Sequence, residues 1–272
     1  MSLPSEVILR PGSLGRLSEL WSYRDLLFSL VQREVRIRYK QTLVGVAWVV
    51  LQPLATALVF ALFFGSWAKL PSGGVPPLVF YFSGLVPWMY FAAALSGAAN
   101  SLVDYRYLLS KVYFPRLILP LAAVMVGAID VGITFLVLLS ILVLHGMPIG
   151  PSVLVAPVFL LLVSFSAFAV GLWLSALNAL YRDVRFALPF VIQFWLFLSP
   201  VVYPSSVIPE KWQLIYALNP MTGIIEGFRW SLLGTEPFPV KPILISMGVL
   251  LLLAIGGLRY FRQVEKTLVD WV

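Results

Sequence analysis

Few residues in this chain could carry out covalent chemistry. Asp130 is the one acid deep inside a long apolar stretch, and His145 is the only histidine. An intramembrane carboxylate suits a proton-coupled carrier, but a proton relay normally uses several such groups. We therefore expect Asp130 to make a structural hydrogen bond or a helix contact in a dimer. His145, in a His-Gly-Met-Pro turn with no nucleophile motif nearby, is interpreted as an exposed turn residue rather than a catalytic base.

The absence of other reactive groups narrows the function further. The 272 residues contain no cysteine, which excludes a disulfide and a cysteine-based zinc site; a cluster of several histidines is excluded as well. No GxxxxGK[ST] sequence is present, so we expect ATP and its magnesium ion to be handled by a partner. No pattern of basic and aromatic residues indicates nucleic-acid binding. We predict no metal or cofactor in this chain.

The composition is that of a membrane protein. Hydrophobic residues make up 60% and charged residues 11%, and the mean hydropathy is +0.94, whereas soluble domains carry about 25% charged residues. Long uncharged runs without alternation favour helices over a barrel. We predict an all-α polytopic membrane protein whose residues 1–43 form a cytoplasmic tail and an interfacial helix. Residues 44–272 should form a domain of six spans, at 44–67, 78–100, 117–144, 152–179, 186–208 and 242–258.

The distribution of basic residues predicts the orientation. Lys and Arg gather before the first span, in the second and fourth loops and at the C-terminus, whereas only Lys69, Lys211, Arg229 and Lys241 fall on the other side. Under the positive-inside rule both termini are cytoplasmic. The first 20 residues lack an apolar core, so we expect the first span to direct insertion rather than a cleaved signal peptide. The net charge of +7 then reflects topology and anionic lipid headgroups.

Residues 24–40 have the pattern of an amphipathic helix. Apolar residues recur every four positions from Tyr23 to Tyr39. We expect a helix in the membrane interface, with its apolar side toward the membrane and its basic side toward headgroups or a cytoplasmic partner. A simple topology anchor explains the periodicity equally well. The basic residues assigned to this interfacial helix are Arg33, Arg36, Arg38 and Lys40.

Two cytoplasmic loops could be either connectors or docking sites. Residues 100–116 are expected to form a short helix that Pro115 ends, because proline interrupts a helix. Residues 181–185, Tyr-Arg-Asp-Val-Arg, form a tight charged turn. The spacing of these residues does not decide between the two roles.

The fifth loop is long, predicted to be outside, and still apolar. Asn219 is suited to an N-cap, Pro220 to the first helical position and Gly234 to the C-terminal stop of a helix too short to span. We favour a re-entrant hairpin over residues 210–234, in which Glu226 and Arg229 neutralise each other. The alternative is a cap lying flat on the outer face.

Four motifs together resemble a known family. They are Val-Arg-Ile-Arg-Tyr-Lys-Gln-Thr-Leu-Val-Gly-Val-Ala-Trp at 35–48 with Gln-Pro-Leu at 52–54, Ser-Lys-Val-Tyr-Phe-Pro-Arg at 110–116, Tyr-Arg-Asp-Val at 181–184, and Leu-Asn-Pro-Met-Thr-Gly-Ile-Ile-Glu-Gly-Phe-Arg at 218–229. In this order, in a chain of this size, they are similar to the permease of type-2 ABC exporters for polysaccharides and polyol phosphates. Relatives of this kind carry lipid-linked O-antigen, capsular polysaccharide or teichoic acid.

The resemblance implies a bacterial inner-membrane permease that forms a homodimer, binds two separate ATPase subunits and moves a polyprenyl-linked polysaccharide. The motifs do not separate the three polymer classes, and O-antigen is expected ahead of capsule or teichoic acid. It implies a main coupling helix at 102–114 and a second contact at 181–185. The ATPase-coupling residues are then Asp104, Tyr107, Lys111, Tyr113, Phe114, Arg116, Arg182 and Asp183. The outer gate residues are Asn219, Pro220, Glu226 and Arg229.

A polymer needs a continuous path, and aromatic faces let sugars stack without holding them strongly. The candidates for this path are Trp48, Phe60, Trp195 and Phe197, although aromatic residues in membrane helices also face lipid or pack between helices. Two other functions make different predictions about the sequence. An ion-coupled secondary transporter predicts internal repeats with broken helices, which the sequence lacks. A membrane enzyme acting on a polyprenyl-linked glycan would need clustered acids or a metal site.

Overall fold

The computed structural model describes residues 17–40, 47–234 and 237–267, and within these ranges every regular element is helical. Five helices are long and apolar enough to cross a membrane. They are α3 (Ala47–Phe60) continued by the π-helical η1 (Ala61–Trp67), α4 (Pro77–Asp104), α6 (Ile118–Leu144), α7 (Ala156–Leu180) preceded by the 3₁₀ turn η2 (Pro151–Val155), and α11 (Val240–Thr267). The prediction of an all-α polytopic membrane protein is therefore confirmed.

The predicted span at 186–208 is shorter in the structure. Helix α8 (Asp183–Phe197) has 15 residues, about 22 Å of helix, which is less than the roughly 30 Å of a hydrocarbon core. It is followed by a turn at 198–203 and the 3₁₀ helix η3 (Ser205–Val207). Val201 and Val202 in that turn are buried within the protein, so their apolar character serves packing rather than lipid contact. The count of six spans is not confirmed.

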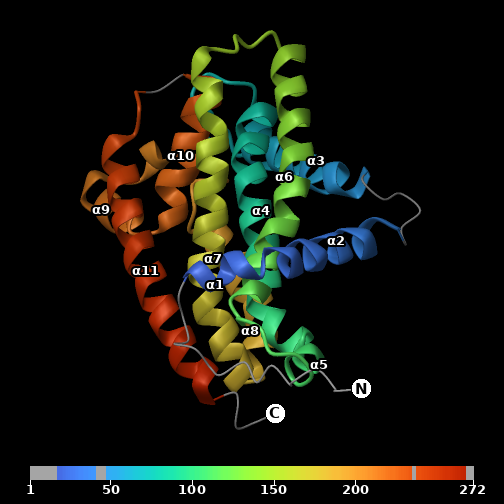
Figure 1. Cartoon of the computed structure of the whole chain (residues 1–272). Helices are drawn as coiled ribbons and strands as arrows, with labels where there is room; N and C mark the ends of the chain where they lie inside the picture. Colours follow the sequence, from blue (N-terminus) through green and yellow to red (C-terminus); the bar gives the residue numbers. More distant parts are fainter. Residues whose placement is uncertain (1–16, 41–46, 235–236, 268–272) are drawn as a thin grey trace, which may run out of the picture.

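Helix α4 lies at the centre of the bundle, packed against α6, α7, α3 and α10 (Figure 1). Small residues let these helices approach closely. A Cβ atom added at Gly171 of α7 would lie 2.7 Å from the Cβ of Ala98 on α4, and one at Gly127 of α6 would lie 2.8 Å from the ring of Tyr90. Such close approach is how van der Waals packing holds membrane helices together.

The first two described helices cross the bundle about halfway along its long helices (Figure 1). They are α1 (Leu17–Ser22) and α2 (Arg24–Lys40). The predicted amphipathic helix is present at the predicted bounds, but its apolar side does not face away from the protein. Leu30 is buried in a cluster with residues from the ends of α4, α6, α7 and α11, and Tyr23 and Val31 pack against the same cluster. The expectation that this side faces the membrane is corrected, because the ends of the spanning helices offer it an apolar surface.

Three segments predicted to be cytoplasmic lie together at one end of the bundle, below α2 in the view: the short α5 (Arg106–Leu109), the start of α8 and the C-terminal half of α11 (Figure 1). We call this end, together with α2, the basic end. The other end holds the turn between α6 and η2 and the start of α11. Helices α9 (Glu210–Ala217) and α10 (Pro220–Leu233) form the predicted hairpin. Most residues of α10 are buried, and α10 contacts α4, α7 and α11. It is thus inserted into the bundle, which disagrees with a flat surface cap.

Candidate functional site: a polar and aromatic cavity

A cavity of about 740 Å³ lies between α2, α3, α4, α6 and α8. Aromatic and amide side chains contribute much of its lining, among them Trp48, Gln52, Phe60, Trp88, Tyr90 and Gln193. Two of the four predicted path residues, Trp48 and Phe60, therefore share one cavity. Trp195 and Phe197 are not among its lining residues, although Ile192 and Leu196 of the same helix are. Aromatic faces beside hydrogen-bonding amides are suited to sugar rings and their hydroxyl groups.

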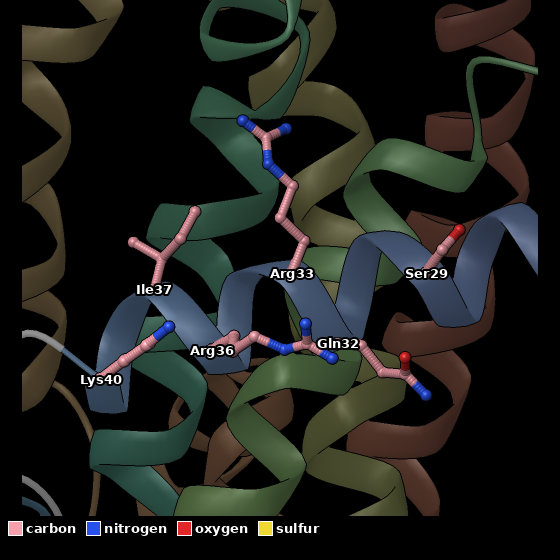
Figure 2. A pocket seen from close by; sticks show the side chains of 6 residues that line it. All are labelled: Ser29, Gln32, Arg33, Arg36, Ile37 and Lys40. Atoms are coloured by element: carbon pink, nitrogen blue, oxygen red, sulfur yellow. The ribbon is translucent and has the colours of Figure 1, made fainter.

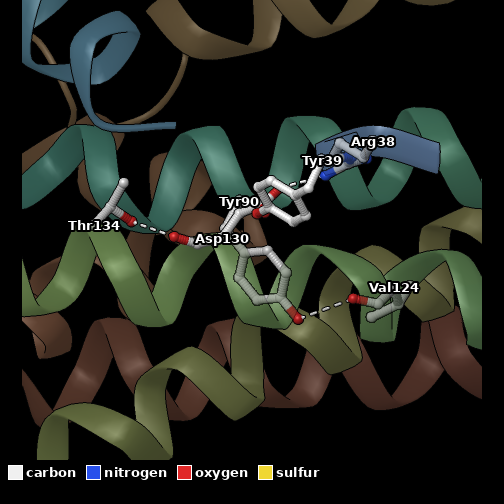
Figure 3. A network of polar contacts seen from close by, with 6 residues as sticks. All are labelled: Arg38, Tyr39, Tyr90, Val124, Asp130 and Thr134. Atoms are coloured by element: carbon white, nitrogen blue, oxygen red, sulfur yellow. Dashed lines mark hydrogen bonds and ion pairs between the residues drawn. The ribbon is translucent and has the colours of Figure 1, made fainter. Parts of the chain in front are cut away.

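Three side chains from α2 and α6 meet in the wall of this cavity (Figure 3). Arg38 forms an ion pair with Asp130, and the hydroxyl of Tyr39 donates a hydrogen bond to the other carboxylate oxygen of Asp130. We call this group the Asp130 latch. Burial, followed by the hydrogen bond to Asp130, raises the pKa of Tyr39 to about 12, so the hydroxyl stays protonated and remains a donor at neutral pH. The predicted structural hydrogen bond of Asp130 is confirmed, and it joins two helices of one chain.

Tyr90 holds the same wall together from α4. Its hydroxyl lies 2.6 Å from Oγ of Ser164 on α7 and donates to the carbonyl of Val124 on α6 at 3.3 Å. Gly127 leaves room for its ring. Tyr90 is therefore a wall residue fixed by three helices, and nothing in its local sequence distinguishes it from an aromatic residue that faces lipid.

The opposite side of α2 is exposed and basic. Figure 2 shows a shallow pocket of about 380 Å³ along it, lined by Ser29, Gln32, Arg33, Arg36, Ile37 and Lys40. Three of the four basic residues assigned to the interfacial helix thus share one face, whereas Arg38 turns to Asp130. Contact of this face with lipid headgroups or a partner stays a prediction.

A second polar contact fixes α2 to the end of α4. The hydroxyl of Tyr105 donates a hydrogen bond to Glu34, and the guanidinium of Arg33 lies 5.8 Å from the Tyr105 ring centre. Burial, and then the hydrogen bond to Glu34, raise the pKa of Tyr105 well above its usual value. Glu34 lies within the apolar stripe of α2, where the periodicity of the sequence gives no sign of its partner on α4.

The predicted coupling helix at 102–114 is shorter than expected. Helix α4 continues to Asp104, and α5 ends at Leu109, so Pro115 does not end it. Because residues 110–115 turn back toward α6 without helical structure, the predicted helix is corrected to a four-residue one. Both candidate docking loops nevertheless meet, since Arg185 forms an ion pair with Asp104 at 3.5 Å.

The predicted coupling residues divide by exposure. Tyr107 is 71% exposed and Tyr113 54% exposed; Lys111 lies 4.1 Å from the ring centre of Tyr107, and Arg182 and Asp183 are also exposed. Phe114 is only 4% exposed and belongs to the apolar cluster of the basic end. Arg116 donates to the backbone carbonyl of Glu265 on α11 at 3.0 Å. Phe114 and Arg116 therefore pack against other helices of the basic end, whereas the exposed residues lie at the surface, where a partner can contact them.

The Asn-Pro corner of the outer hairpin is confirmed as a helix start. The side-chain oxygen of Asn219 accepts from Met221 N at 3.0 Å, and Gly234 adopts the left-handed conformation at the C-cap. The Asn219 amide also donates to Ser199 Oγ at 2.9 Å and to the Leu198 carbonyl at 3.0 Å. The end of α8 and the start of α10 are thus joined through one side chain. The role of Asn219 and Pro220 in a gate stays a prediction.

Arg229 is 9% exposed and lies at the junction of α10, α4 and the turn after α8. Its guanidinium donates to the carbonyls of Phe80 and Val201 and to Ser83 Oγ, each at 3.4 Å. It also lies 3.9 Å from the Phe80 ring centre. These acceptors and the aromatic face stabilise a charge that would be costly to bury alone. Mutual neutralisation with Glu226 stays a prediction.

Among the described residues, no group of three or more His, Cys, Asp or Glu side chains could hold a metal ion. His145 is exposed at the end of α6, and its Nδ1 lies 2.9 Å from the carbonyl of Ile141. The described part of the chain presents a cavity, the hairpin of α9 and α10, and a basic end.

Comparison with known proteins agrees with this arrangement. The family model described as ABC-2 type transporter matches residues 25–233. The chain is 31% identical over 256 residues to the O-antigen export system permease protein RfbA of Myxococcus xanthus, covering 91% of this chain and 96% of that one. It is 28% identical to the protein of the same name from Klebsiella pneumoniae, covering 89% and 92%. It is 21% identical to the polysialic acid transport protein KpsM of Escherichia coli, covering 88% and 94%. The matched segment includes the cavity, the loops of the basic end and the outer hairpin, and the chain belongs to the ABC-2 type transporter family.

Proposed function

We propose that this chain is the permease subunit of an ATP-driven exporter that moves a lipid-linked polysaccharide of the O-antigen class from the cytoplasm across the bacterial inner membrane. The structural observation that carries the proposal is the cavity of about 740 Å³, lined by aromatic and amide side chains. A glycan can stack on Trp48 and Trp88 and form hydrogen bonds with Gln52 and Gln193. Contacts of this kind let a chain slide, and the two charged residues in the lining, Arg38 and Asp130, are paired with each other.

Energy comes from a partner in this proposal. Two ATPase subunits hydrolyse ATP with magnesium, and they bind the basic end, where Tyr107 is exposed and Asp104 joins the two loops through Arg185. Two copies of the permease assemble around the polymer. Helix α3 supports this arrangement, because its apolar side chains are only weakly buried within one copy of the chain. A second copy could cover the surface that they form. Both termini are cytoplasmic.

The O-antigen class is preferred over capsule or teichoic acid because of the pattern of similarity. Identity to the two O-antigen export permeases is 31% and 28%, whereas identity to the polysialic acid transport protein is 21% over a similar length. The substrate assignment rests on this difference. Its polyprenyl carrier follows from the exporter class.

Deletion of this gene in its native host tests the proposal. O-antigen should disappear from surface lipopolysaccharide and accumulate on its lipid carrier inside the cell, and the plasmid-borne gene should restore it. Loss of capsular polysaccharide with intact O-antigen would contradict the substrate class. Gln193→Ala and Trp48→Ala should lower surface O-antigen at unchanged protein level, whereas Trp212→Ala, at an exposed position of α9 outside the cavity, should not.

A further inference from the structure

Two polar contacts fix helix α2 to the bundle, one to the end of α4 and one to the middle of α6. Glu34 accepts from Tyr105 at the end of α4, and four residues later Arg38 and Tyr39 bind Asp130 in the middle of α6. One helical turn, about 6 Å, separates these contacts along α2. Only the second belongs to the lining of the cavity. The two contacts can therefore be broken independently, and one serves as the control for the other.

The Asp130 latch is the part of the cavity wall to which α2 contributes. Arg38 and Tyr39 are the α2 residues in the lining, and Trp48 and Phe60 line the same cavity from α3. The side chain of Arg38 is 45% exposed and that of Asp130 is 22% exposed, so the pair is open to the cavity rather than sealed in the core. A partly hydrated ion pair can open without the large penalty of exposing a buried charge.

A carboxylate in this position has no evident packing role. Asp130 is the one charged residue of the helix from Ile118 to Leu144, and a neutral residue there would avoid the cost of placing an acid within a membrane helix. Both oxygens of its carboxylate accept a hydrogen bond from α2, one from Arg38 and one from Tyr39. The acid thus specifically orients the last turn of α2 across the cavity end.

We propose that Asp130 is a positioning residue for export: it holds Arg38 and Tyr39 so that the last turn of α2 closes the basic end of the cavity, and this contact must open for the glycan to enter. The inference rests on the proposed function for the identity of the polymer. The closure itself belongs to the permease alone. It can therefore be measured without any substrate.

The test uses thiol accessibility in inside-out membrane vesicles that contain the full-length chain. The chain has no native cysteine, so Thr56→Cys in the cavity wall is the only thiol. Its rate of reaction with a membrane-impermeant thiol reagent reports how often the cavity is open. Asp130→Asn should raise this rate about tenfold, because hydrogen bonds to charged groups are the stronger ones and their loss shifts the open population by that order. Tyr39→Phe should raise it by less, since one of the two contacts remains.

Three controls make the result decisive. Asp130→Glu retains a carboxylate and should bring the rate back to within a few fold of the parent. Glu34→Gln loosens α2 away from the cavity and should leave the rate unchanged. Ser110→Cys, in the exposed loop after α5, should react equally in all backgrounds and shows that the reagent has access. Arg38→Gln breaks the latch from α2 and should reproduce the effect of Asp130→Asn if that variant is poorly produced.

An unchanged rate in both Asp130→Asn and Arg38→Gln would overturn the proposal. An equal increase in Glu34→Gln would overturn it as well, because it would reduce Asp130 to a general anchor for α2. Because no polysaccharide or ATPase takes part, a wrong substrate assignment would leave the labelling result intact. In cells, Asp130→Asn should lower surface O-antigen at normal protein level, because Arg38 and Tyr39 are then no longer held in position at the cavity. Normal surface O-antigen together with increased labelling would refute the positioning role.

Discussion

The indole Nε1 of Trp195 donates a hydrogen bond to the side-chain oxygen of Asn219 at 3.0 Å. This bond joins α8, whose residues Ile192 and Leu196 line the cavity, to the cap of α10. The Trp195 ring also packs edge-on against Phe91 of α4 at 5.1 Å. Trp195 is therefore placed behind the cavity wall, as a link between the cavity and the outer hairpin.

The variant Trp195→Phe tests whether Trp195 acts through its hydrogen bond to Asn219 or by stacking on a sugar. The change removes the hydrogen bond but keeps an aromatic face, so we expect a loss of roughly 1 kcal/mol in stability and a several-fold decrease in export. Thermal unfolding in detergent and surface O-antigen measure the two effects. Trp212→Phe, at an exposed position of α9, is the matched control. Full export in Trp195→Phe, together with loss in Trp195→Ala, would instead favour stacking on substrate.

The outer hairpin offers a test of charge neutralisation. Arg229→Gln and Glu226→Gln each leave one charged group near membrane depth, whereas the double change leaves none. If the pair neutralises itself, the double variant should export more polymer than Arg229→Gln alone. Strictly additive effects, measured as surface O-antigen and unfolding temperature, would show that Phe80, Ser83 and Val201 hold Arg229 without help from Glu226.

Gly84 on α4 offers a second test of the Arg229 site, by a change of side-chain size rather than of charge. A Cβ atom at Gly84 would lie 2.5 Å from a guanidinium nitrogen of Arg229 and 3.3 Å from Val201 Cα. Gly84→Ala should therefore displace Arg229 and lower export without changing any charge. Gly132→Ala on α6, where a Cβ atom meets nothing within 4 Å, should be silent. Equal export in both variants would contradict the importance of the Arg229 position.

The basic end yields a prediction that separates docking from folding. Tyr107 is exposed, so Tyr107→Ala should leave the permease inserted and stable but weaken ATPase binding. Phe114 is buried, so Phe114→Ala should cost about 3–5 kcal/mol and lower the amount of folded protein. Copurification of the ATPase and the unfolding temperature of the permease distinguish the two. A stable Phe114→Ala variant with impaired ATPase binding would contradict the assignment of Phe114 to folding rather than docking.

The predicted orientation can be checked with single cysteines in intact cells. Ser206→Cys, exposed after α8, should react with an impermeant thiol reagent from outside. Ser110→Cys should react only after the membrane is opened. Labelling of Ser110→Cys in intact cells would place the basic end outside and contradict the positive-inside assignment.

Local features of the sequence predicted local structure well. The cap of α10 was predictable because Asn219, Pro220 and Gly234 act within a few residues of themselves. The partners of Asp130 were not, since Arg38 lies 92 positions away and periodicity carries no information about which helices pack. Hydropathy also overestimated the fifth span: Val201 and Val202 are apolar because they are buried in a turn, and a scale of residue polarity does not separate that case from contact with lipid.

The central position of α4 has a consequence for biogenesis. Helices enter the membrane in chain order, so α4 is inserted before α6, α7 and α10, the helices that surround it, have been synthesised. During that interval its buried faces, including Ser83 and Ser101, are solvated by lipid or held by insertion machinery. The Arg229 site then forms only when α10, which follows α4, α6 and α7 in the chain, packs against α4. Assembly of this permease is therefore completed after insertion, and truncation before α10 would leave the inserted helices without the packing of α10 on α4 and α7.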